Sequence, residues 1–200
     1  MKKLASVILL ISLITLSGCA QTYSNKLAVY DFDTLIVQYE LDGDIQGDET
    51  LYIRGDESAI YRYITRGEQE EQKLELHLGE KKQIVNMIAL TAVEVTDQDY
   101  VNMEDLNKEG QENYLIRKDL GLREDVEIPK STMTKKIAGQ TCDVYEVSNV
   151  REVCIWKGII LENTTSIAGI TNTKTATSIM VNKDIDTAKF QIPSNVVLAK

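Results

Sequence analysis

The sequence contains few of the residue types that most often carry enzymatic or metal chemistry. Its 200 residues include one histidine, one tryptophan, two prolines and three cysteines, and they contain no Cys-x-x-Cys pair. Gly-x-Ser-x-Gly, His-Glu-x-x-His and phosphate-binding glycine loops are also missing. Zinc ligands usually come in pairs roughly two to four residues apart, a spacing that these cysteines do not have. We therefore expect no enzymatic activity, no metal site and no cofactor.

Basic residues are also in short supply. The chain has 22 Lys and Arg against 31 Asp and Glu, a formal charge of −9. Nucleic acid and anionic lipid headgroups repel such a chain, so nucleic acid is excluded as a partner. Apolar residues make up 43% of the sequence, which is enough for the core of one folded domain.

The N-terminus combines a positive start with an apolar run. Lys2 and Lys3 precede the run from Leu4 to Leu16, which is too short for a comfortable membrane span and is typical of a signal peptide. The run ends in Leu-Ser-Gly-Cys at residues 16–19, which looks like a bacterial lipobox. We expect cleavage before Cys19 and lipidation of its thiol; an ordinary signal peptide with an incidental cysteine is the alternative.

A lipidated Cys19 would anchor the protein in a membrane, since two acyl chains suffice for stable attachment. No Asp follows Cys19, which favours the outer membrane, facing the periplasm, in bacteria that sort lipoproteins by that residue. The predicted organisation is a signal peptide at 1–18, a lipidated tether at 19–27 and a single β-rich domain at 28–200.

Cys142 and Cys154 are the two cysteines that lipidation leaves over. In the oxidising periplasm such a pair is expected to form a disulfide. Strands at 141–147 and 150–161 with a turn at 148–149 would form a hairpin, and a three-residue loop centred on Ser148 would place the cysteines directly opposite each other. A structural disulfide is our prediction; free thiols and a redox pair are the alternatives.

The first half of the domain predicts an antiparallel meander. Segments with alternating polarity are separated by glycines at hairpin-like spacing between residues 43 and 79. In the stretch 72–79, Leu74 and Leu76 are expected to point inward and Glu75 and His77 outward. His77 is therefore interpreted as a solvated histidine, not a catalytic base. The stretch 81–97 is more continuously apolar, which predicts deeper burial.

The character of the sequence changes between residues 97 and 121. This segment lacks two-residue alternation and is rich in helix formers, so it predicts a helical insertion. We expect Gly110 to divide it into two short helices and Gly121 to form the C-terminal cap. Strands return after Pro129. The fold class is thus α+β, mainly antiparallel β, with a curved sheet.

The C-terminal part resembles a known architecture. It has Ile-Ala-Gly at 137–139, Cys-x-Val-Tyr at 142–145, a strand containing Trp156 and a late Phe-x-Ile-Pro at 190–193. This pattern is similar to domains grouped with the bacterial lipoprotein carrier LolA and receptor LolB. The resemblance implies a half-barrel with an apolar cavity suited to acyl chains, although the early hairpin loops here are acidic, unlike the exposed apolar loop of the receptor.

Two functions follow as hypotheses. In the first, the concave sheet binds an acyl chain, a lipoprotein or another apolar ligand, and Trp156 is a weak candidate for lining the cavity; core packing of Trp156 is the alternative. In the second, the protein is a non-enzymatic envelope accessory lipoprotein whose surface binds a protein partner. An open or a filled interior distinguishes them.

Overall fold

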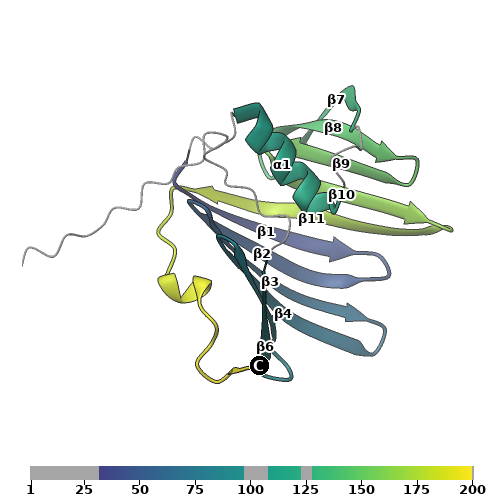
Figure 1. Ribbon diagram of the computed structural model, residues 1–200. Helices are drawn as coiled ribbons and strands as arrows, with labels where there is room; N and C mark the ends of the chain where they lie inside the picture. The colour runs from purple at the N-terminus through teal and green to yellow at the C-terminus, as the bar shows by residue number, and fades with distance from the viewer. Residues whose placement is uncertain (1–31, 97–107, 123–127, 200) are drawn as a thin grey trace, which may run out of the picture.

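The computed structural model describes residues 32–96, 108–122 and 128–199, and it shows one curled antiparallel sheet with a single helix against it (Figure 1). The strands lie in the order β12-β6-β5-β4-β3-β2-β1-β11-β10-β9-β8-β7. The chain runs outward from β1 to one edge and then returns from the opposite edge. The predicted fold class, α+β with a curved and open sheet, is confirmed.

The strand bounds are as follows. The first half contains β1 (Thr34–Asp42), β2 (Gln46–Arg54), β3 (Glu57–Arg66), β4 (Gln69–Leu78), β5 (Lys81–Asn86) and β6 (Thr91–Thr96). The second half contains β7 (Lys130–Ile137), β8 (Gln140–Ser148), β9 (Arg151–Trp156), β10 (Ile159–Ile167), β11 (Ile170–Val181) and the short β12 (Val197–Leu198). Helix α1 spans Lys108–Leu120, and a 3-10 turn, η2, spans Thr187–Phe190.

The two halves of the sheet are joined through β1 and β11. These strands are antiparallel neighbours with a register shift between Gln38 and Tyr39. At one end of the pair, the Asn182 backbone NH donates to the Thr34 carbonyl and the Asn182 side chain accepts from the Asp33 NH, both at 2.9 Å. Gly43 lies at the other end, where a Cβ would come within 2.3 Å of the Thr171 carbonyl oxygen. Only glycine therefore allows the β1–β2 turn to approach β11 this closely.

Three apolar clusters fill the structure. The first lies around β1, β8 and β10 and includes the disulfide; the second lies between β3–β6 and the C-terminal segment; the third lies under α1. The first includes Leu35, Val37, Val144 and Leu161, the second Leu74, Leu76, Val85 and Phe190, and the third Ile116, Leu120, Val153 and Ile160. These three clusters contain all the buried apolar side chains of the described residues.

The C-terminal segment is held against the second cluster. Phe190 is buried there, and the Arg54 guanidinium lies 4.3 Å from the centre of its ring. The Tyr61 hydroxyl donates to the Lys189 carbonyl at 3.1 Å. The end of the chain thus covers one face of β2 to β5 and leaves their opposite face uncovered.

Helix α1 differs from the prediction in one respect. Gly110 lies inside the first turn of the helix, so it does not divide two helices as expected; residues 97–107 lie outside the described residues. A glycine costs about 1 kcal/mol in a helix interior but little near a terminus. The predicted cap is present: Gly121 has φ 64°, and the Leu122 NH donates to the Arg117 carbonyl at 2.8 Å.

The disulfide joins Cys142 to Cys154, as the structure shows, but the predicted register is wrong. Val144, not Cys142, lies directly opposite Cys154, because the β8–β9 turn has two residues, Asn149 and Val150, and lies further along the chain than the three-residue loop predicted around Ser148. The Cα atoms of the two cysteines are nevertheless 5.4 Å apart, within bridging range. Both side chains are almost completely buried in the first cluster.

The stretch 81–96 is less buried than the sequence predicts. The stretch 81–96 forms the edge hairpin β5–β6, in which only Val85 and Ala92 are buried. Ile88, Leu90, Val93 and Val95 are exposed. Apolar density in sequence does not ensure burial near the edge of an open sheet: only the two-residue β12 lies beyond β6, and Val93 and Val95 point to the face that the C-terminal segment leaves uncovered. No helix within the described ranges combines the length and the apolar character needed to cross a membrane.

Candidate functional site: the charged face of strands β2 to β5

The residues singled out from the sequence do not form one site. Cys19 lies outside the described residues, and the Cys142–Cys154 disulfide is internal. Trp156 packs against Phe32 with ring centres 6.0 Å apart, at the margin of the first cluster, which assigns it to core packing. His77 is only 16% exposed, so the expectation of a solvated histidine is wrong. It belongs instead to a group of charged side chains.

The charged face is the side of β2 to β5 that the C-terminal segment leaves uncovered. Its strands alternate, so that on β4 the buried Leu74 and Leu76 of the second cluster have the charged Lys73 and Glu75 pointing the other way. Lys174 on β11 extends to the same group from across β1. The charged face comprises Glu49, Arg62, Lys73, Glu75, His77, Lys82 and Lys174.

Strand register brings these residues together. Arg62 is directly opposite both Glu49 on β2 and Lys73 on β4. His77 on β4 is directly opposite Lys82 on β5. Direct cross-strand neighbours on one face approach within about 5 Å, so the row from Glu49 to Lys73 forms a continuous contact.

Glu49 is the most buried charged group of the face, with 3% of its surface exposed. The Arg62 Nε donates to Glu49 Oε2 at 2.7 Å, and the Lys174 Nζ donates to Glu49 Oε1 at 3.1 Å. The Lys174 ammonium also lies 4.6 Å from the centre of the Tyr39 ring. Burial alone would raise the pKa of Glu49, but Lys174 and Arg62 hold the pKa below its ordinary value.

Glu75 forms a second ion group. Its carboxylate lies 2.7 Å from the Lys73 ammonium and 2.9 Å from the Lys82 ammonium, and the His77 Nε2 is 3.9 Å away. Burial would raise the pKa of Glu75, but hydrogen bonds from the two lysines and their charges lower the pKa from 4.5 to about 2. Both carboxylates are therefore ionised at neutral pH and are unsuited to proton transfer.

The lowered pKa of Glu75 predicts a dependence of stability on acid. Because the folded pKa lies below the unfolded value, the stabilisation is complete above pH 4.5 and is lost as the pH falls towards 2. We expect Glu75→Gln to be less stable than the native chain at pH 6, with the difference shrinking between pH 4.5 and 2. Urea unfolding at a series of pH values measures this; a constant difference would contradict the assignment.

An aliphatic row runs across the middle of the charged face. Ile60, Glu75, Ile84 and Val93 are direct cross-strand partners in that order, from β3 to β6. Ile60 and Ile84 are half-buried, and Val93 is 48% exposed. Charged rows lie on either side and the ionised Glu75 interrupts the row, so the face offers aliphatic side chains among charged groups.

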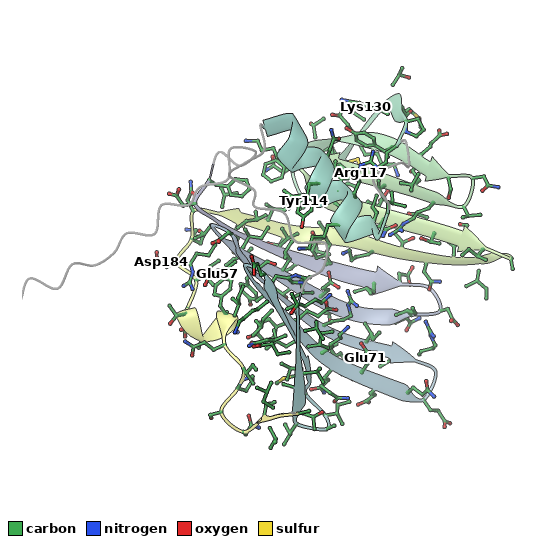
Figure 2. The ribbon with its side chains drawn as sticks, viewed as in Figure 1. Glu57, Glu71, Tyr114, Arg117, Lys130 and Asp184 are labelled. Atoms are coloured by element: carbon green, nitrogen blue, oxygen red, sulfur yellow. A yellow bond between two sulfur atoms is a disulfide. The ribbon has the colours of Figure 1, made fainter. Side chains whose placement is uncertain are left out.

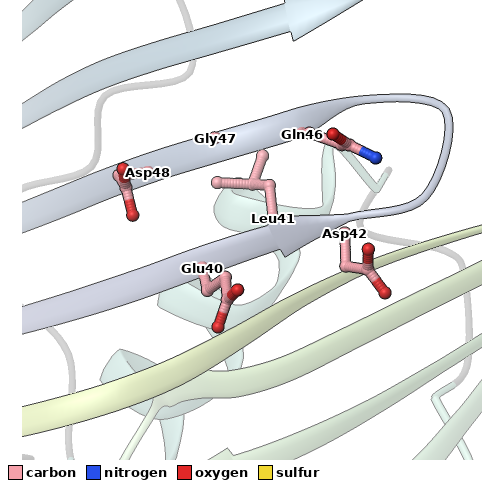
Figure 3. A pocket seen from close by; sticks show the side chains of 6 residues that line it. All are labelled: Glu40, Leu41, Asp42, Gln46, Gly47 and Asp48. Carbon is pink, nitrogen blue, oxygen red and sulfur yellow. The ribbon is translucent and has the colours of Figure 1, made fainter.

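A separate depression lies at the β1–β2 hairpin (Figure 3). It has a volume of about 280 Å³ and is lined by Glu40, Asp42 and Asp48 together with Leu41 and Gln46. Glu40 and Asp48 are direct cross-strand partners of like charge. Among the described residues, no group of three or more His, Cys, Asp or Glu is arranged to hold a metal ion. The depression is open and polar, and it does not suit an acyl chain.

The charged face could have been predicted in part from the sequence, by combining strand alternation with the length of the β3–β4 turn. Gly67 and Glu68 form a two-residue turn, and a turn of that length fixes the β3–β4 register. That register places Arg62 opposite Lys73, a pairing of like charges that would itself have pointed to this face. The contribution of Lys174 could not be found this way, because it depends on β11 returning to pair with β1.

Comparisons with known proteins bear on the fold. No protein-family model and no curated protein matches the chain. An uncharacterized conserved protein from Thermus thermophilus is similar in structure, with a TM-score of 0.54 and 6% identity over 83% of this chain and 89% of that one. At this identity the likeness shows a shared fold and nothing of function.

Two further structures match more distantly. MucB has a TM-score of 0.37 and 10% identity, covering 82% of this chain and 60% of MucB. The Mycobacterium tuberculosis lipoprotein LppX has a TM-score of 0.34 and 8% identity, covering 78% of this chain and 90% of LppX. Both likenesses are too weak to support an argument. What is shown of the expected LolA/LolB-like architecture is an open, curled antiparallel sheet with a helix against it.

Proposed function

We propose that this chain is a lipid-anchored cell-envelope protein of LolA/LolB-like fold that binds an amphipathic ligand on the charged face of β2 to β5. The observation that carries the proposal is the row of aliphatic side chains, the half-buried Ile60 and Ile84 and the exposed Val93, that runs among the charged groups of this face. Acyl chains or other apolar groups would gain about 25 cal/mol per Å² of surface buried there, before the costs of ordering. The proposal assigns no reaction to the protein.

The position of the helix supports placing the ligand on this side. Lys174 is directly opposite Asn163, and Asn163 is directly opposite Val153, so the three share one face of the sheet. Ile116 and Leu120 of α1 pack with Val153. The helix therefore lies on the same side as the charged face and bounds it beyond β11.

The anchor belongs to the same proposal, and it is tested by removing its thiol. Cys19→Ser is expected to release the protein from the membrane fraction, because the net charge of −9 offers no electrostatic attraction to anionic lipid. Fractionation of cells followed by detection of the protein measures this. Cys142→Ser is the control and should remain with the membranes. Equal pelleting of the Cys19→Ser and native chains would contradict the anchor.

Ligand binding is tested by native mass spectrometry of the full chain with an uncharged acyl probe, monomyristoylglycerol. We expect one probe molecule to be retained. Ile84→Asp is expected to weaken retention by about tenfold, since it places a charge in the aliphatic row. Ile170→Asp is the matched control, because Ile170 is 52% exposed at the β10–β11 turn, away from the charged face. Equal retention by all three chains would contradict the proposal.

One observation favours the alternative function, an accessory lipoprotein that binds a protein partner. Ile167 and Ile170 are 59% and 52% exposed at the β10–β11 turn. The neighbouring β8–β9 turn adds Val150, whose carbonyl accepts a hydrogen bond from the Ser166 NH at 2.8 Å. Three aliphatic side chains on adjacent turns suit an apolar contact with another protein. If the native chain retains no acyl probe, this alternative takes precedence.

A further inference from the structure

The charged face carries more positive than negative charge, although the protein as a whole is acidic. Four cations, Arg62, Lys73, Lys82 and Lys174, lie around two carboxylates, Glu49 and Glu75, among the described residues. A third carboxylate of the same face, Glu71, is exposed and lies towards the β3–β4 turn (Figure 2). In a chain with a formal charge of −9, this local excess of cations is unexpected.

The cations are held in a costly arrangement. Their side chains are between 18% and 31% exposed, and each carboxylate is shared by two of them. Arg62 and Lys73 are directly opposite across β3 and β4, where like charges repel. Partly buried charges without full compensation are unfavourable, and an additional anion would relieve both the repulsion and the desolvation.

We infer that the charged face binds a phosphate ester, held by Lys73 and Lys82 together with Arg62. Ammonium and guanidinium groups form the strongest hydrogen bonds of proteins with phosphate oxygens. The aliphatic row of Ile60, Ile84 and Val93 lies directly beside these cations. The inference rests on the proposed ligand-binding role and names the polar end of the same ligand. The phosphate belongs either to a lipid headgroup or to a soluble phosphate ester.

The test uses the full chain in uncharged detergent and sn-glycerol 3-phosphate as an acyl-free probe, with binding measured by calorimetry at low and high salt. We expect saturable binding that weakens with salt. Lys73→Gln is expected to reduce affinity by about tenfold, because one charged hydrogen bond to phosphate is lost. Lys81→Gln is the matched control: Lys81 adjoins Lys82 in sequence but points to the opposite face, where it pairs with Glu94 and is 64% exposed.

A variant with increased affinity for sn-glycerol 3-phosphate distinguishes a binding role of the lysines from a structural one. Glu75→Gln replaces the carboxylate that Lys73 and Lys82 share at 2.7 Å and 2.9 Å by a neutral amide. Both ammonium groups then become available to the probe, and we expect affinity to rise by about threefold or more. A variant that only damaged the fold would lose affinity. No binding by the native chain, equal loss in Lys73→Gln and Lys81→Gln, or a fall in Glu75→Gln would each overturn the inference.

The source of the phosphate is resolved with a second probe. If it is a lipid headgroup, dihexanoyl phosphatidylglycerol should bind about tenfold more tightly than sn-glycerol 3-phosphate, because its short chains contact the aliphatic row. Equal affinities would indicate a soluble ester. The uncharged acyl probe separates the two proposals, since it reports the aliphatic row alone. Retention of that probe without any binding of sn-glycerol 3-phosphate would leave the ligand-binding proposal standing and refute the phosphate site.

Discussion

Replacing Glu49 by alanine is expected to lower the free energy of unfolding by about 3 kcal/mol, the largest effect of any single substitution proposed here. The carboxylate is 3% exposed and accepts from both Arg62 and Lys174. Its removal leaves two partly buried cations next to each other without their shared anion. Urea unfolding at neutral pH, with the linear extrapolation to water, measures the change.

The matched control for this prediction is Glu57→Ala. Glu57 also pairs with an arginine, Arg54, at 2.7 Å, but both side chains are about one-third exposed. Exposed pairs contribute about 1 kcal/mol or less, so Glu57→Ala should change stability little. Equal losses for the two alanine variants would contradict the idea that burial makes Glu49 the centre of the charged face.

Loss of the disulfide is expected to have an effect of similar size. The double variant Cys142→Ala, Cys154→Ala should be about 3 kcal/mol less stable than the oxidised chain, in the chain-entropy model for a loop of this length. The bridge links the neighbouring strands β8 and β9 and lies in the first apolar cluster, so its removal also loosens that cluster. Urea unfolding with and without reductant measures both effects.

Two further observations would check the disulfide prediction. Because both sulfurs are buried, reductant should act slowly on the folded native chain and quickly in urea. The fully reduced native chain should then unfold near the midpoint of the double variant. If the oxidised chain, the reduced chain and the double variant all have the same urea midpoint, the bridge contributes nothing to stability.

Local patterns in the sequence were sufficient for most of the architecture. Alternation in β3 and β4 indicated which side chains share a face, because the two-residue period of a strand is local. Gly121 was identified as a helix cap for a similar reason: its left-handed conformation is set within one turn. Gly110 was misread because the sequence did not show where α1 begins.

Errors arose where a property depended on elements distant in the chain. Much of the apolar stretch 81–96 is exposed because it lies near the edge of an open sheet, with only the two-residue β12 beyond it, which no local pattern reveals. His77 is only 16% exposed although it alternates with leucines, because Lys82 lies directly opposite on β5 and the Glu75 carboxylate lies 3.9 Å from its Nε2. The disulfide register was wrong for a local reason: the β8–β9 turn lies at Asn149 and Val150, not in a three-residue loop centred on Ser148.

The sequence by itself determined the β-rich fold class, the hairpin order, the pairing of Cys142 with Cys154 and the motif around Cys19 on which the anchor proposal depends. Those features depend on strand periodicity, turn residues and short motifs, all of which are local in the sequence. Only the tertiary structure decided that Lys174 reaches Glu49, 125 residues away, and that four cations gather on one face of an acidic protein. Such a cluster is created by β11 returning to pair with β1 and by the registers of five strands, and these are set by packing of the whole sheet, not by any local stretch.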